Sequence, residues 1–200
     1  MKLLLIRHGE SEADILRVCE GRADFPLTER GERQARAMAG YVAAHYELSA
    51  IYCSTLTRAR QTAQKLSEAT GVPLTPDERL MEFNNGLRAG LPYAEAYEKY
   101  PNVPDLPPHC SVYEQESVYE FRFRTKCMLS ELLCSADDDQ TIAAVAHGGT
   151  INAMLRAFTE IPDCADIGFS TGDTGIHELH IDNGKRRVVM LNYTDHTAGI

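Results

Sequence analysis

Short apolar runs that alternate with helix-type segments constrain the fold of this chain more than any other feature. The runs 2–6, Ala50–Cys53 and Thr141–Ala146 are too short for helices and typical of buried strands. Between the first two, apolar residues recur at helical spacing over 28–44, behind the helix-capping residue Thr28. Strands that alternate with helices predict an α/β fold of three layers, with a mostly parallel central sheet covered by helices on both faces.

Segments of the same two kinds continue to the end of the chain. Their spacing predicts helices over 56–69, over 118–134 and from near Gly148, and strands over 72–75, near 176–181 and near 187–191. Gly71 follows the first of these helices, where glycine often ends a helix. Asn183-Gly184, between the last two strands, favours a hairpin turn, so at least one edge strand should be antiparallel. No linker or repeat divides the segments, which predicts one domain over 1–200.

A proline-rich stretch interrupts this rhythm between 84 and 117. Its prolines are Pro92, Pro101, Pro104, Pro107 and Pro108. Because proline lacks a backbone N–H and clashes with the preceding helical turn, no long regular helix can run through the second half of the stretch. Long irregular segments inside compact domains are usually functional lids or binding loops, and we expect 84–117 to be an inserted lid.

Charge and composition limit the partners and the location of the protein. The formal net charge is −9, which argues against nucleic acid or an anionic membrane as a partner. No apolar run approaches the length of a membrane span, and the first is too short for a signal peptide, so the cytoplasm is the expected location. The cysteines have no CxxC pair or metal-ligand spacing and are expected to be buried thiols. They are Cys19, Cys53, Cys110, Cys127, Cys134 and Cys164.

Two of the predicted strands end in the same kind of sequence. The first is followed by Arg7-His8-Gly9, and Thr141–Ala146 is followed by His147-Gly148-Gly149. Ligands of open α/β sheets bind at the carboxyl ends of parallel strands, so the two histidines should face one crevice. Gly148 also opens a helix, whose free backbone N–H groups favour an anion. A lone histidine after a strand is more often structural, but two in one context, one of them beside an arginine, favour a site.

Two further side chains with useful chemistry follow the other strands. Arg58 comes soon after Ala50–Cys53, and Glu82 comes after the third strand and a short connection. On its own Arg58 would be a solvated helix residue. Beside two histidines, however, an arginine is suited to bind an anionic group through its rigid donor fork.

Four motifs in this order and spacing resemble the signatures of the histidine phosphatase superfamily, which includes the phosphoglycerate mutases. The motifs are Arg7-His8-Gly9-Glu10, Arg58-Ala59-Arg60-Gln61-Thr62, Leu80-Met81-Glu82 and His147-Gly148-Gly149. The resemblance takes in the segment 25–35 and runs from residue 2 to about residue 156. One Arg-His-Gly alone would be a weak signal, whereas four motifs in sequence are a strong one.

What the resemblance implies is a metal-independent phosphatase of the histidine acid phosphatase type that needs no cofactor. His8 would attack phosphorus and be phosphorylated transiently, which divides one difficult displacement into two easier ones. Glu82 would protonate the leaving oxygen and then take a proton from water. The other matched groups would bind the phosphoryl group and stabilise its charge. They are Arg7, Arg58, His147 and the backbone at Gly148.

One residue near the reacting centre departs from the family pattern. Family members usually have asparagine seven residues after the first arginine, where its amide can donate to phosphate, and this chain has Asp14. An ionised carboxylate has no proton to donate and would repel a phosphate dianion. Asp14 therefore either turns away from the pocket or stays protonated and donates to phosphate at acidic pH.

A cysteine-dependent phosphatase is the nearest rival chemistry. Cys53 lies between a strand and a helix that carries arginines, and that class has five residues between cysteine and arginine. Here four residues separate Cys53 from Arg58 and six separate it from Arg60, so the spacing fails.

Within the resembled family, the charge of the lid favours a phosphatase over a phosphoglycerate mutase. A mutase must hold a bisphosphate, and family mutases carry additional basic residues, including an adjacent arginine pair, in the inserted region. From Gly86 to Glu120 this chain has only Arg88 and Lys99 as fixed positive charges. The acids of that range are Glu95, Glu98, Asp105, Glu114, Glu116 and Glu120. Glu116-Ser117 and Arg124 instead resemble small bacterial phosphatase-type members.

The expected partner is a small-molecule phosphomonoester. The acidic lid and its tyrosines are compatible with a substrate that has a neutral or partly apolar body, although the tyrosines could equally pack the lid onto the domain. A mutase is the alternative function, and a non-catalytic sensor of a phosphorylated ligand is a less favoured one. The tyrosines are Tyr93, Tyr97, Tyr100, Tyr113 and Tyr119.

Overall fold

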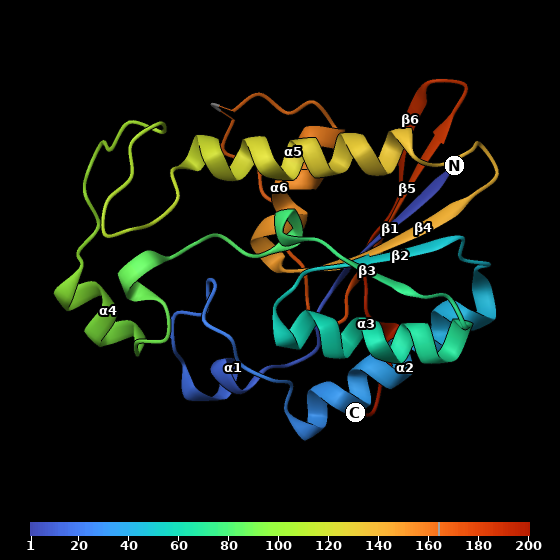
Figure 1. Ribbon diagram of the computed structural model, residues 1–200, viewed down its shortest axis with the longest axis horizontal. Coiled ribbons are helices and arrows are strands. Elements are labelled where there is room, and N and C mark those ends of the chain that lie inside the picture. Colours follow the sequence, from blue (N-terminus) through green and yellow to red (C-terminus); the bar gives the residue numbers. More distant parts are fainter. Residues whose placement is uncertain (164) are drawn as a thin grey trace.

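Six strands form a sheet in the order β3-β2-β4-β1-β5-β6 (Figure 1). The structure is a computed structural model that describes residues 1–163 and 165–200. The strands are β1 (Lys2–Arg7), β2 (Ala50–Cys53), β3 (Leu74–Pro76), β4 (Thr141–Ala146), β5 (Ile176–Asp182) and β6 (Lys185–Tyr193). The first four pair in parallel, whereas β5 pairs antiparallel with both β1 and β6. The predicted mostly parallel sheet with an antiparallel pair at one edge is confirmed.

Helices cover both faces of this sheet. They are α1 (Glu12–Leu16), α2 (Glu29–His45), α3 (Thr57–Thr70), α4 (Tyr93–Lys99), α5 (Val118–Cys134) and α6 (Gly148–Phe158). Figure 1 shows α2 and α3 on one face and α5 and α6 on the other. The same view places α1 and α4 beyond the carboxyl ends of the parallel strands, away from the N-terminus. The three predicted layers are therefore present. No helix in the described part of the chain is long and apolar enough to cross a membrane.

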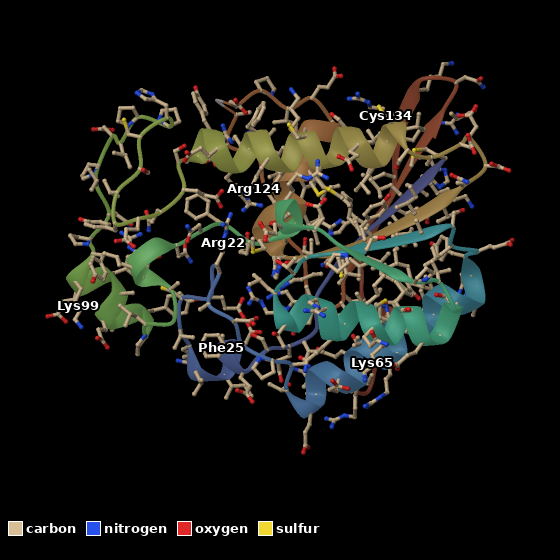
Figure 2. The ribbon with its side chains drawn as sticks, viewed as in Figure 1. Arg22, Phe25, Lys65, Lys99, Arg124 and Cys134 are labelled. Carbon is tan, nitrogen blue, oxygen red and sulfur yellow. The ribbon has the colours of Figure 1, made fainter. Side chains whose placement is uncertain are left out.

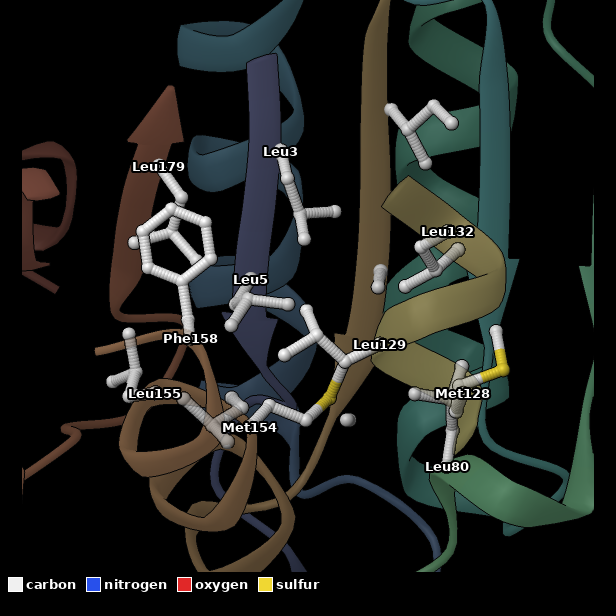
Figure 3. Packing of buried hydrophobic residues seen from close by; sticks show 14 of the residues in the cluster. Leu3, Leu5, Leu80, Met128, Leu129, Leu132, Met154, Leu155, Phe158 and Leu179 are labelled. Carbon is white, nitrogen blue, oxygen red and sulfur yellow. The ribbon is translucent and has the colours of Figure 1, made fainter. Parts of the chain in front are cut away.

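The side chains of β1 alternate between the two faces and belong to two hydrophobic cores. Leu3 and Leu5 pack with residues of α5 and α6, including Phe158 (Figure 3). Leu4 and Ile6 pack on the other face with residues of α2 and α3. All four are almost completely buried, and full burial of such a side chain is worth about 1.5–3 kcal/mol. Packing from both sides holds β1 firmly and so determines where the residues after it lie.

Local sequence signals predicted the boundaries of several elements. Thr28 caps α2, because its side-chain oxygen accepts the Gly31 N–H at 2.9 Å. Gly71 ends α3 with a φ of 74°. Asn183 and Gly184, between β5 and β6, have φ values of 49° and 75°, as this kind of hairpin turn requires.

Two elements differ from the sequence prediction. The third strand was expected over 72–75 but begins at Leu74, because the Val72 carbonyl still accepts a hydrogen bond from the Ser67 hydroxyl at the end of α3. The short helix α1 was not predicted. It forms because Ser11 and Asp14 make a capping box at its first turn.

The lid over 84–117 is mostly irregular, as its prolines predict. Its regular elements are α4 and the short 3₁₀ helix η2 (Gly86–Arg88), both in its first half. Arg88 is buried and donates from Nε to the Tyr100 carbonyl at 2.8 Å, which holds the lid together. The lid is also bound to the loop after α1. There the Cys19 N–H donates to the Leu91 carbonyl at 2.9 Å, and the Cys19 carbonyl accepts from Gly90 at 2.8 Å.

The cysteines are less uniformly buried than expected. Cys19 and Cys53 are buried, Cys110 and Cys127 are partly buried, and all five described cysteines are free thiols. Cys134 is exposed, so the prediction of a buried thiol is wrong there, because this last residue of α5 faces solvent. Cys164 lies outside the described residues.

Candidate active site

The carboxyl ends of β1 and β4 bring two histidines together. These strands are parallel neighbours with Arg7 opposite Ala146, so His8 and His147 leave the sheet side by side. Their ring centroids are 5.0 Å apart, and both side chains are buried. Arg58, near the start of α3, reaches the same place from the end of β2. Three side chains that follow three different strands therefore lie close together at this edge of the sheet.

His8 is oriented by its own loop. Its Nδ1 lies 2.7 Å from the Gly9 carbonyl, so Nδ1 carries the ring proton and donates it there. Nε2 then carries a lone pair and no proton, and it accepts a hydrogen bond from Arg58 Nε at 3.3 Å. Burial, together with the charges of Arg58 and Arg7, lowers the pKa of His8 well below its ordinary value. His8 is therefore a neutral imidazole whose Nε2 faces the arginine.

His147 has one bonded and one unbonded ring nitrogen. Its Nε2 lies 2.8 Å from the Ser54 hydroxyl oxygen. Nδ1 is buried and has no hydrogen-bond partner among the described residues. Burial lowers the pKa of His147 well below its ordinary value, and the positive charges of Arg58 and Arg7 act in the same direction. Ser54 was not among the predicted site residues, because a serine after a strand has no distinguishing pattern.

Arg58 is fully buried, which is rare for an arginine, and its guanidinium is held by backbone carbonyls. Nη1 donates to the Ala23 carbonyl at 3.0 Å, and Nη2 donates to the Gly21 carbonyl at 2.9 Å. These two bonds leave Nε directed at His8 and available to an anion bound beside it.

Arg7 has a donor without a partner, next to the start of α6. Its Nη1 donates to the Thr171 carbonyl at 3.0 Å and lies 3.2 Å from Asp173 Oδ1. Its Nε is buried and unpaired among the described residues. Gly148 lies alongside, since a Cβ at that position would be 4.0 Å from Arg7 Nε. The Gly148 N–H is one of the free donors of a helix start, so the two groups form a place for an anion beside the histidines.

Backbone N–H groups hold the Glu82 carboxyl group next to this candidate anion site. Its Oε2 accepts from Gly149 at 2.8 Å and its Oε1 accepts from Phe83 at 2.8 Å. A Cβ at position 149 would lie 2.5 Å from Glu82 Oε1, so any other residue there would displace the carboxyl group. The His147-Gly148-Gly149 motif thus positions the carboxyl group as well as a histidine.

Arg124, from α5, fixes the segment that carries Glu82. Its Nη1 donates to the Arg79 and Met81 carbonyls at 2.9 and 2.7 Å, and its Nη2 donates to the Glu82 carbonyl at 2.8 Å. The same guanidinium forms a two-bond ion pair with Glu116 of the lid, at 2.7 and 2.8 Å. Arg22 Nη2 lies 3.6 Å from Glu116 Oε2, so a second arginine faces the same carboxylate. Arg124 therefore joins α5, the Glu82 segment and the lid.

Asp14 lies at the rim of the site, with 36% of its side chain exposed. Its Oδ2 accepts from the Ser11 N–H at 2.8 Å and from the Ser11 hydroxyl at 2.9 Å, as part of the cap of α1. Its Oδ1 lies 3.8 Å from Arg7 Nη2. One oxygen thus serves the helix cap and the other faces an arginine.

A carboxyl group that no sequence pattern singled out lies beside His8 and Arg58. Glu20 places Oε2 at 4.0 Å from His8 Nε2 and Oε1 at 3.7 Å from Arg58 Nε. A glutamate in an irregular loop has no periodic pattern, so only the folded chain reveals its position.

These groups are suited to bind and transfer a phosphoryl group. A neutral imidazole with a free Nε2 is a nucleophile, and the arginines and the start of α6 offer donors to anionic oxygens. Within residues 1–163 and 165–200, no three His, Cys, Asp or Glu side chains are grouped so that they could hold a metal ion. Metal independence stays a prediction.

Comparison with known proteins identifies the family. The model of the histidine phosphatase superfamily (branch 1) matches residues 3–194. This chain belongs to that superfamily, as the four motifs predicted.

The relatives include phosphatases and a mutase. A putative phosphoserine phosphatase 2 of Hydrogenobacter thermophilus is 32% identical over 98% of this chain and 97% of its own length. A 2,3-bisphosphoglycerate-dependent phosphoglycerate mutase of Cytophaga hutchinsonii is 29% identical over 88% of this chain and 87% of its own. Among solved structures, YhfR of Bacillus stearothermophilus superposes with a TM-score of 0.87 at 26% identity and covers 98% of both chains.

Proposed function

We propose that this protein is a phosphatase that hydrolyses a small phosphomonoester through a phosphohistidine on His8. The observation that carries the proposal is the state of the His8 ring. Nδ1 donates to the Gly9 carbonyl, so Nε2 carries no proton, and its lone pair accepts only a long hydrogen bond of 3.3 Å from Arg58 Nε. Two nearby buried nitrogens, Arg7 Nε and His147 Nδ1, have no hydrogen-bond partner among the described residues, and a bound phosphoryl group could supply one.

In the first step His8 Nε2 attacks phosphorus, and the bond between phosphorus and the alcohol oxygen breaks. Glu82 gives its proton to that oxygen, and the alcohol leaves. The phosphorylated ring keeps its Nδ1 proton, and the Gly9 carbonyl stabilises the resulting positive charge. Arg7 and Arg58 stabilise the negative charge that spreads over the three phosphoryl oxygens.

In the second step a water molecule attacks phosphorus on the phosphorylated His8. Glu82, now a carboxylate, takes a proton from the water. The bond between phosphorus and Nε2 breaks, its electron pair returns to the ring, and phosphate leaves. The sum of the two steps is one phosphomonoester and one water converted to an alcohol and phosphate.

The lid favours a phosphatase over a mutase. Arg88 and Lys99 are the fixed cations of 84–117, and both are engaged within the lid. Arg88 is buried against the Tyr100 carbonyl, and Lys99 pairs with Glu95 at 2.6 Å. Figure 2 shows Lys99 at the far end of α4, away from the sheet. Neither supports a second phosphate of a bisphosphate.

A mutase activity is kept as the second candidate, because one of the relatives is a phosphoglycerate mutase. Incubation with 3-phosphoglycerate and 2,3-bisphosphoglycerate separates the two functions. A phosphatase should release phosphate, whereas a mutase should accumulate 2-phosphoglycerate. O-phosphoserine is the first monoester to assay, since another relative is a putative phosphoserine phosphatase.

The experiment that tests the proposal is the trapping of a phosphoenzyme. Wild-type protein mixed with ³²P-labelled monoester and quenched without acid should carry label that is lost in acid and kept in base. His8→Ala should carry no label and should not release p-nitrophenol from p-nitrophenyl phosphate. His45→Ala changes an exposed histidine at the end of α2 and should behave as wild type. Label on cysteine, or no label in a single turnover, would rule the mechanism out.

A further inference from the structure

The carboxyl group of Glu20 lies beside His8 and Arg58, next to the place where a phosphoryl group would meet His8. Its two oxygens lie 4.0 Å from His8 Nε2 and 3.7 Å from Arg58 Nε. Oε1 also lies within hydrogen-bond distance of the Ser11 hydroxyl, whose single proton can go either to Glu20 or to Asp14. Only 18% of the side chain is exposed. Two anionic oxygens facing a histidine and an arginine resemble two oxygens of a bound phosphate.

Hydrogen bonds on both sides of Glu20 hold its backbone beside His8 and Arg58. Arg58 binds the carbonyls of Gly21 and Ala23 just after it. Cys19, just before it, exchanges two backbone hydrogen bonds with the lid, through Gly90 and Leu91. The loop is therefore fastened both to α3 and to the lid. A bound phosphate must share its surroundings with the Glu20 side chain.

The charges around Glu20 make its ionised form unfavourable once an anion is bound. Arg58 and Arg7 face it as cations, Asp14 of α1 faces it as a second acid, and neutral His8 adds no charge. The uncharged groups nearby are Ser11, Cys19 and Tyr93, the last from α4 of the lid. Burial raises the pKa of Glu20 and the charge of Asp14 adds to this, while Arg58, Ser11 and Arg7 act in the opposite direction. A phosphate dianion would add two further negative charges.

We propose that Glu20 is a proton-dependent ligand of the phosphoryl group, which enters the complex as a neutral carboxylic acid and donates its proton to a phosphoryl oxygen. A protonated carboxyl group has the O–H donor that a carboxylate lacks. The binding of a dianion at this site therefore takes up one proton. The inference rests on the proposed function, because it takes the anion bound beside His8 to be the phosphoryl group of the substrate.

Inorganic sulfate is the probe that tests this, because it stays a dianion between about pH 5 and about pH 8, where phosphate itself would titrate. Its affinity for the whole protein is measured by titration calorimetry across that range. In wild type the affinity should fall by up to about tenfold per pH unit above the pKa of Glu20. Glu20→Gln has a neutral donor at every pH. The ratio of its affinity to that of wild type should rise from about 1 near pH 5 to at least about 10 near pH 8.

A second variant separates donation from simple repulsion. Glu20→Ala lacks both the negative charge and the donor, so it should bind sulfate more tightly than wild type near pH 8 and more weakly near pH 5. If Glu20 only repels anions, Glu20→Ala would bind at least as tightly as wild type at every pH, and the proposal would be overturned. Thermal unfolding of each variant confirms that it is folded.

Two other acids of α1 serve as comparisons. Glu12→Gln changes an exposed carboxylate, and its affinity ratio to wild type should stay near 1 at each pH. If the ratio of variant to wild-type sulfate affinity rises with pH in Asp14→Asn and stays flat in Glu20→Gln, then Asp14 carries the proton. That result would overturn the proposal. Failure of sulfate to bind wild type near pH 5 would overturn it as well.

Sulfate binding is measured without turnover, so the phosphatase mechanism and the role of Glu20 can fail separately. A rising ratio in Glu20→Gln without any phosphoenzyme on His8 would contradict only the phosphatase mechanism. A phosphoenzyme on His8 with a flat ratio would contradict only the role of Glu20.

Discussion

At the scale of single residues, each group in the site is defined by the bonds it already makes. His8 is fixed by the Gly9 carbonyl and accepts only the long bond from Arg58 at Nε2, whereas His147 is bonded through Nε2 to Ser54 and has no partner at Nδ1 among the described residues. The two neutral histidines therefore have different ring nitrogens available to a ligand. Glu82 differs again, because both its oxygens are held by backbone N–H groups.

Glu82→Gln should slow the reaction to a degree that depends on the leaving group. Alkyl phosphates need protonation of the departing oxygen, so their kcat should fall by about 10²–10⁴-fold. p-Nitrophenyl phosphate, whose leaving group needs little protonation, should lose much less. Steady-state kinetics with both kinds of substrate measure the difference.

The control for this variant is Glu78→Gln, an exposed glutamate four residues before Glu82. It should leave both rates unchanged, because its side chain faces solvent. Equal losses on both substrates in Glu82→Gln would assign the acid role to another residue.

At the scale of elements, the position of Glu82, the proposed acid, depends on a contact between α5, the Glu82 segment and the lid. The segment after β3 has little regular structure, and three of its carbonyls are bound by Arg124. The planar guanidinium can bind these carbonyls and both oxygens of Glu116 at once, which a lysine cannot do.

Arg124→Lys should therefore lower kcat even though the charge is kept. Displacement of Glu82 by a fraction of an ångström to 1 Å is expected to reduce kcat by about 10- to 100-fold. Arg122→Lys is the matched control on the same helix, where Arg122 pairs with Asp163 at 3.0 Å outside the site. A loss of equal size in both variants would mean that α5 is sensitive to any such change, and that Arg124 does not position Glu82.

At the scale of the whole molecule, several buried histidines make the fold sensitive to acid. His8, His147 and His177 are all buried, and burial lowers the pKa of each. His177 lies behind the site on β5. Its Nε2 lies 2.9 Å from the Thr171 hydroxyl oxygen, and its Nδ1 accepts a hydrogen bond from the Asn192 N–H at 3.2 Å.

The free energy of unfolding should fall as the pH drops below about 6.5. Burial lowers the pKa of His177 from its ordinary 6.5 to about 4. Between these values the folded chain keeps the ring neutral while the unfolded chain takes up a proton. Each such histidine contributes a loss of at most about 1.4 kcal/mol per pH unit in that range. Urea denaturation at a series of pH values measures the slope.

His177→Gln should flatten this slope, because an amide can accept from Asn192 and donate to Thr171 without titrating. His45→Gln, at an exposed position, should keep the wild-type slope. The prediction is wrong if His177→Gln and wild type lose stability equally between about pH 6 and about pH 4.

The sequence by itself determined the class of fold, the order of the elements and the residues most suited to phosphoryl transfer. These features depend on local signals. The period of the hydrophobic residues distinguishes a strand from a helix. Thr28 marks the start of α2, Gly71 marks the end of α3, and Asn183-Gly184 marks the turn of the hairpin. His8, Arg58 and His147 could be singled out because each follows a predicted strand, whose carboxyl end is where such sheets bind ligands.

The tertiary structure alone decided how those residues act on one another. The strand order places His147 beside His8, and Arg58 lies 50 residues from His8 in the chain. Glu82 and the Gly149 N–H that holds it are 67 residues apart. Glu20 lies in a loop with no pattern, and its place in the pocket follows from bonds between that loop, Arg58 and the lid. Such contacts join residues far apart in the chain, so no local pattern specifies them.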